Sequence, residues 1–110
     1  MASVYKVLAQ SNPAATTETT LYTVTTSYSG IVSTIAVCNQ ASTAATYRIA
    51  VRPAADGSTT AKHWIVYGAT VPASDSVMLT VGITMAAGDK IQIYASSANL
   101  SFSAFGSEVN

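Results

Sequence analysis

Short runs in which apolar and polar residues alternate cover most of the chain, and turn-forming residues separate them. The pattern is cleanest over Thr46–Arg52, where every second residue from Tyr47 to Val51 is apolar or aromatic. A period of two indicates a strand with one buried face. Turn signals such as Asn12-Pro13, Asp56-Gly57 and Gly88-Asp89 recur at intervals of roughly 8–12 residues, which is typical of an all-β sandwich or barrel.

Eight strands are expected from this pattern, and helix signals are nearly absent. The predicted strands are Val4–Ala9, Leu21–Thr26, Ile31–Cys38, Thr46–Arg52, His63–Tyr67, Ser76–Val81, Lys90–Ala95 and Leu100–Phe105. The segment Asn12–Thr20 is expected to be a long connection, which lets the first strand pair far from the second. The sequence therefore predicts a single-domain antiparallel β-sandwich over residues 1–110, either jelly-roll or immunoglobulin-like, with the strand order left open.

Strict alternation also assigns faces to individual side chains. In the third strand it places Ile31, Ser33, Ile35 and Val37 on one face, and it places Cys38 on the other as a buried, inert thiol. Trp64 and Tyr67 are three positions apart and are expected to point to opposite faces of one strand, with Trp64 in the core.

Composition narrows the function classes. Charged residues are only 9% of the chain, and the net charge is zero, which argues against nucleic-acid binding because phosphates require surplus cations. Cys38 is the one cysteine, so no disulfide framework is expected. No run approaches the roughly 18 apolar residues of a membrane-spanning helix. Lys6 interrupts the first apolar run, so no secretory signal is expected.

Candidate catalytic groups are few. His63 is the only histidine and Cys38 the only cysteine, so neither a base–nucleophile pair nor a cluster of metal ligands can be assembled from them. Asp56, Asp75 and Asp89 fall in turn signals, where aspartate bonds nearby backbone amides. A calcium site made from these acids lacks the spacing of a calcium loop. We therefore expect no enzyme activity, no metal and no cofactor, and a pocket that brought His63 near Asp75 or Asp89 would reopen the question.

The predicted surface carries Ser, Thr and Ala where Lys and Glu are usual on exposed strands, and such a surface favours association. Terminal strands are readily added to a neighbour's sheet. Arg48 and Arg52 share a strand face and are either anchors for a partner's carboxylates or solvated residues. The expected interface residues are Val4, Tyr5, Val7, Arg48, Arg52, Trp64 and Phe105.

Three segments, MASVYKVLAQSNPAATTETTLYTV, STIAVCNQASTAATYRIAVRPA and VPASDSVMLTVGITMAAGDKIQIYASSANLSFSAFGSEV, together resemble small virion structural proteins of tailed bacteriophages. The resemblance covers nearly the whole chain but contains no catalytic motif. It implies a non-enzymatic β-sandwich subunit present in many copies on the virion, made in the host bacterial cytoplasm. The expected role is capsid decoration (cement). The chain is expected to form a homo-oligomer, a trimer, that binds the major capsid protein or neighbouring virion subunits.

Two alternatives stay open. The first is a tail, baseplate or adhesin-type subunit whose β-sandwich binds glycan, suggested by Trp64, Tyr67 and Tyr94. The second is an enzyme, which ranks last because no converging titratable groups can be assembled from the sequence.

Overall fold

The computed structural model describes residues 3–110, and eight strands account for most of them. The strands are β1 (Ser3–Ser11), β2 (Thr19–Thr23), β3 (Ser29–Asn39), β4 (Ala45–Arg52), β5 (Trp64–Val71), β6 (Ser76–Met85), β7 (Lys90–Ala95) and β8 (Leu100–Val109), with one 3₁₀ turn, η1 (Ala61–His63). All eight predicted strands are confirmed, with changed ends in all but Lys90–Ala95. The second ends at Thr23 rather than Thr26, and His63 belongs to η1 rather than to β5.

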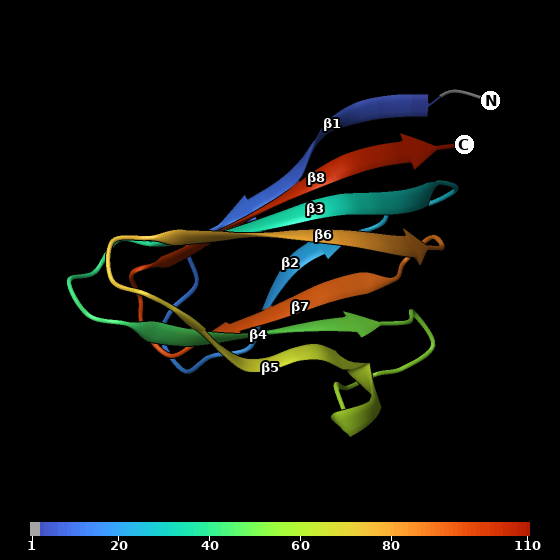
Figure 1. The fold of residues 1–110 in the computed structure, drawn as a ribbon. Coiled ribbons are helices and arrows are strands. Elements are labelled where there is room, and N and C mark those ends of the chain that lie inside the picture. Colours follow the sequence, from blue (N-terminus) through green and yellow to red (C-terminus); the bar gives the residue numbers. More distant parts are fainter. Residues whose placement is uncertain (1–2) are drawn as a thin grey trace.

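The strands form two antiparallel sheets of four, in the orders β1-β8-β3-β6 and β2-β7-β4-β5 (Figure 1). Strands one and eight, two and seven, three and six, and four and five are each paired. This is a long antiparallel hairpin rolled into two layers, which is the jelly-roll arrangement. The immunoglobulin-like alternative is excluded because it places different strands together in each sheet.

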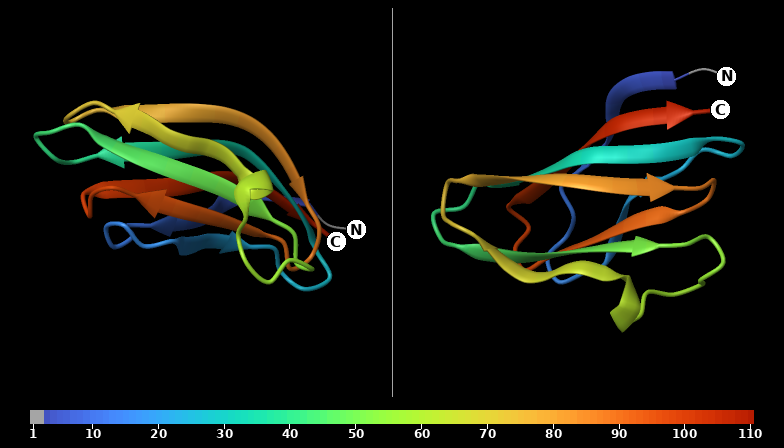
Figure 2. Two further views of the ribbon diagram at one scale, coloured as in Figure 1. Left: turned by 90° about the horizontal axis from the view of Figure 1, so that it is seen from below. Right: turned by 45° about the vertical axis from the view of Figure 1, so that its right-hand side comes forward.

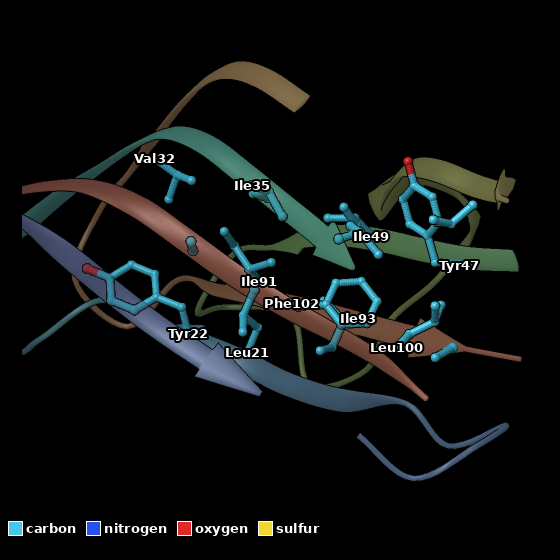
Figure 3. Close-up of a cluster of buried hydrophobic side chains, with 14 of the residues drawn as sticks. Leu21, Tyr22, Val32, Ile35, Tyr47, Ile49, Ile91, Ile93, Leu100 and Phe102 are labelled. Atoms are coloured by element: carbon cyan, nitrogen blue, oxygen red, sulfur yellow. The ribbon is translucent and has the colours of Figure 1, made fainter. Parts of the chain in front are cut away.

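The core fills the space between the sheets, as Figure 3 shows. Phe102 of β8 and Tyr47 of β4 meet edge to face across this space, with ring centroids 6.2 Å apart. Ile35, Ile49 and Ile93 surround them and are fully buried. The alternation predicted for Thr46–Arg52 is confirmed, because Tyr47 and Ile49 point inward while Arg48 and Arg52 do not.

Extra residues in several strands break the strict alternation. In β3 the register shifts between Val32 and Thr34, so Ser33 is additional and the faces exchange there. Val32 and Ile35 are both buried as a result, and the prediction that Ile31, Ser33, Ile35 and Val37 share a face is wrong. The prediction of a buried Cys38 is also wrong, because that thiol is half-buried on the opposite face from Val37.

Gly106 of β8 lies directly beside the bulge in β3. A Cβ atom at this position would overlap the Ile31 carbonyl oxygen and crowd the Val32 Cα. Glycine is therefore required here by the close approach of two backbones. The bulge and the glycine together allow β8 to stay paired with β3 over the whole length of the sheet.

One buried amide organises the loops at one end of the sandwich. The Asn39 side chain donates to the carbonyls of Thr43, Val71 and Pro72, and its own oxygen accepts the Ala41 backbone N–H. It therefore connects the β3–β4 loop to the β5–β6 connection. The sequence marks Asn39 only as a turn residue.

Both chain ends lie at the same end of the sheet β1-β8-β3-β6 (Figures 1 and 2). β1 forms one edge of this sheet and pairs only with β8, so its outer hydrogen-bonding edge faces away from the rest of the sheet. Within residues 3–110, no helix is long and apolar enough to cross a membrane.

Candidate functional site: two faces and a buried histidine

The outer face of β1-β8-β3-β6 carries no charged side chain among the residues that the structure describes. The sheet contains two charged residues, Lys6 and Glu108, and both point toward the second sheet. Lys6 Nζ lies 3.2 Å from Glu108 Oε1. Glu108 Oε2 accepts hydrogen bonds from the Tyr22 hydroxyl at 2.6 Å and from the Thr25 hydroxyl at 2.9 Å.

These contacts determine how Glu108 ionises. Hydrogen bonds from Tyr22 and Thr25, with the nearby Lys6 ammonium, lower the pKa of Glu108 to about 2 despite its burial. Burial and the adjacent carboxylate raise the pKa of the Tyr22 hydroxyl. Glu108 is therefore ionised and internally neutralised at neutral pH, which leaves the outer face of its own strand uncharged.

Apolar side chains occupy this outer face instead, and we call it the charge-free face. Tyr5 is 85% exposed and lies across β8 from Ile31, which is 41% exposed. Val7 lies beside Phe105 in the next row. Met78 extends the apolar surface along β6. The charge-free face is defined by Tyr5, Val7, Ile31, Met78 and Phe105.

The predicted interface residues divide between the two sheets. Val4, Tyr5 and Val7 are exposed on β1, and half-buried Phe105 pairs with Val7. Val4 pairs with Glu108, so it lies on the opposite face of β1 from Tyr5 and Val7. The other three, Arg48, Arg52 and Trp64, lie on the outer face of the second sheet. The seven residues therefore cannot form one continuous surface, and the structure provides two candidate surfaces.

Three aromatic rings surround one guanidinium on this second sheet. Arg48 of β4 pairs in register with Tyr94 of β7 and Tyr67 of β5. Its Cζ lies 4.1 Å from the Tyr67 ring centroid, 4.3 Å from that of Tyr94 and 5.9 Å from that of Trp64. We call these four residues the arginine–aromatic cluster. Cation–π contact with aromatic faces stabilises a guanidinium at these distances.

The cluster exists because β5 is bulged at two places. Register shifts leave Gly68 and Ile65 without direct partners on β4, and Gly68 adopts a φ of +80° that suits glycine. Because Ile65 is the extra residue between them, Trp64 and Tyr67 share one face, with ring centroids 5.6 Å apart. The prediction that they point to opposite faces is wrong, and so is the prediction that Trp64 packs in the core, since it lies half-buried outside the core cluster.

A hollow borders the cluster. It has a volume of about 550 Å³ and is lined by Thr59, Thr60, Ala61, Trp64 and Tyr67. Sites for small organic ligands commonly combine apolar and aromatic walls with a few polar groups in volumes of about 300–1,000 Å³. The position of the hollow beside the paired rings makes it the candidate ligand site of this face.

Arg52, the second arginine of β4, belongs to a separate polar network. Arg52 Nη1 donates to the Thr59 hydroxyl at 3.1 Å and lies 3.7 Å from Glu18. Partial burial opposes ionisation of Glu18, but hydrogen bonds from Gln92 and Thr59 and the charge of Arg52 lower its pKa. Arg52 is thus neutralised within the chain and is not a free anchor.

His63 is buried and bound on both ring nitrogens. The Thr60 backbone N–H donates to Nδ1 at 2.8 Å, so Nδ1 is the acceptor and Nε2–H donates to Asp56 Oδ2, also at 2.8 Å. This hydrogen bond lowers the pKa of Asp56. The histidine lies near Asp56 rather than near Asp75 or Asp89, and its contacts fasten the loop that precedes β5.

The other turn acids behave as predicted. Asp89 accepts the backbone N–H groups of Ala54 and Ala86, and Asp75 accepts that of Ser76. Within residues 3–110, no three His, Cys, Asp or Glu side chains converge as metal ligands would. No protein-family model matches the chain, and no curated protein matches it.

Proposed function

We propose that the chain is a non-enzymatic structural subunit of a tailed-bacteriophage virion, a capsid decoration protein that stabilises the assembled head as a homotrimer. The observation that carries the contact role is the charge-free face. Burying an ion that lacks a partner costs several kcal/mol, and this face presents none on any of its four strands. Its burial against another subunit therefore removes apolar surface from water at no cost in ion desolvation.

The free edge of β1 supports the same role. β1 pairs with β8 alone, and exposed strand edges bind further strands unless charge, proline or a bulge prevents it. The bulge at Leu8 interrupts the register between Val7 and Ala9. The part of β1 that precedes it is regular, and its one charged side chain, Lys6, is paired with Glu108. Strand addition there would place a neighbouring copy directly beside Tyr5 and Val7.

Assignment to a virion head rests on the resemblance of the sequence to phage structural proteins. The jelly-roll fold is compatible with such a subunit. Viral capsid subunits, lectins and cupins all share this fold, so the fold supports the assignment only by analogy. The alternative, a tail, baseplate or adhesin-type subunit, is favoured by the arginine–aromatic cluster, a surface that capsid stabilisation does not require.

Cryo-electron microscopy of purified virions that contain this chain tests the proposal. We expect many copies on the outer surface of the head, with Tyr5 and Ile31 buried against a neighbouring subunit. Density for the chain only in the tail or baseplate would favour the alternative. Absence of the chain from purified virions, determined by mass spectrometry, would contradict both.

A further inference from the structure

The arginine–aromatic cluster lies on the sheet opposite the charge-free face and has no part in the contacts proposed above. We infer that it binds a carboxylate-bearing saccharide, in which the Arg48 guanidinium holds the carboxylate of a uronic acid and the Trp64 and Tyr67 rings pack against the sugar ring. The inference goes beyond capsid stabilisation and does not depend on it.

Arg48 has no acid partner among the residues that the structure describes. Among residues 3–110 it makes only the three ring contacts, without a hydrogen bond or ion pair. Glu18 is already bound by Arg52, Thr59 and Gln92, and Asp56 is already bound by His63. The guanidinium therefore keeps its five N–H donors for a ligand.

The Arg48 guanidinium is also held in place before a ligand arrives. Tyr94 and Tyr67 flank Arg48 from the two neighbouring strands, so binding costs less of the side-chain entropy that a free arginine would lose. A planar guanidinium matches a carboxylate with two parallel hydrogen bonds. These properties favour a carboxylate over a neutral hydroxyl as the group that Arg48 recognises.

The hollow beside the cluster suits the rest of the ligand. Trp64 and Tyr67 line the hollow of about 550 Å³. Thr60 also lines it and precedes η1 in the chain, whereas the two aromatic residues follow η1. Aromatic rings offer a large apolar surface together with a polar end, which suits the C–H face and the hydroxyl rim of a pyranose. In a uronic acid the carboxylate is attached to the pyranose ring, so one ligand would place its carboxylate at Arg48 and its ring against Trp64 and Tyr67.

Fluorescence titration is the direct test, because Trp64 is the only tryptophan of the chain. The probes are oligomers of galacturonic, glucuronic and mannuronic acid, each compared with its methyl ester. We expect a saturable change in Trp64 emission with at least one acid. Esterification of that acid and the substitution Arg48→Gln should each weaken binding at least tenfold. The matched control is Lys62→Gln, which removes the same charge from an exposed side chain outside the cluster and should bind normally.

Several outcomes would overturn the inference. They are no response to any of the three acids, equal binding of acid and ester, and equal losses in Arg48→Gln and Lys62→Gln. A change in Trp64 emission with protein concentration alone would mean that another copy covers this face, which also overturns it. None of these results bears on whether the charge-free face is buried in a virion.

Discussion

Trp64 and Tyr67 lie edge to face on the same side of β5, although three positions separate them in the chain. In a regular strand they would face opposite ways. One extra residue, Ile65, lies between them and reverses the alternation, and Gly68 is a second extra residue directly after Tyr67. The most chemically distinctive surface of the protein therefore depends on irregular backbone.

The conformation of Gly68 gives a first prediction. Its φ is +80°, and no atom would contact an added Cβ, so Gly68→Ala introduces backbone strain without a clash. We expect a loss of about 1 kcal/mol in the free energy of unfolding, measured by urea denaturation. The control Gly82→Ala, also in open space but without a positive φ, should change stability by less than about 0.5 kcal/mol. Equal effects would contradict the strained turn.

Substitution of Gly106 is expected to cause a larger loss in the free energy of unfolding, for a different reason. An added methyl group would overlap the Ile31 carbonyl oxygen, so β3 and β8 must separate where they pair. We expect Gly106→Ala to cost about 1–3 kcal/mol or more. The measurement is the urea midpoint relative to Gly82→Ala, and a stability equal to that of the parent chain would show that the two backbones are not in close contact.

Substitution of Asn39 tests whether one side-chain amide connects two loops. Removing its side chain in Asn39→Ala leaves the carbonyls of Thr43, Val71 and Pro72 without this donor. Since an unsatisfied buried group costs about 1–3 kcal/mol, we expect a loss of at least that size. Amide exchange should increase in both the β3–β4 loop and the β5–β6 connection. Faster exchange in only one of them would contradict the connecting role.

Glu108 predicts how stability depends on pH. Its pKa is about 2 in the folded chain and near 4.5 when unfolded, so the unfolded chain binds the proton first as pH falls. The contribution of the ionised group is complete above about pH 5 and is lost as pH falls from about 4.5 to 2. Over this pH range, the contribution of Glu108 to the free energy of unfolding amounts to up to about 3 kcal/mol.

Denaturation of the parent chain and of Glu108→Gln between pH 2 and 7 measures this contribution. The variant should be less stable at neutral pH, and its stability should fall less between pH 4.5 and 2. Glu18→Gln, which alters a more exposed carboxylate, is the comparison. Parallel curves for the parent chain and Glu108→Gln would contradict the assigned cause.

Much of the fold was predictable because apolar alternation is a local property. It located all eight strands, and it assigned Tyr47 and Ile49 to the core. The bulges at Ser33 and Ile65 were not predictable, because an extra residue carries no distinctive side chain yet reverses every face beyond it. Gly68 carried a signal, because glycine marks turns and bulges, but the predicted strand ended before it at Tyr67, so it indicated an end of the strand rather than a bulge within it.

The candidate surfaces were only partly predictable for the same reason. The low charge of the chain predicts association, which stays a prediction, and the expected interface residues Tyr5, Val7 and Arg48 lie on the outer faces of the two sheets. The jelly-roll order depends on pairing between distant strands, which local patterns do not record. The arginine–aromatic cluster depends on that order, because β7, β4 and β5 must be neighbours before Tyr94, Arg48 and Tyr67 can meet.

The central claim is that the charge-free face packs against other copies of the chain, and sedimentation velocity measures this directly. The parent chain should sediment as a trimer, with about three times the mass of one 11.3 kDa chain. Tyr5→Glu and Ile31→Glu, which place a charge on the face, should sediment as monomers, while Thr46→Glu on the opposite sheet should not. A parent chain that remains monomeric at every concentration, or glutamate variants that assemble as it does, would contradict the claim.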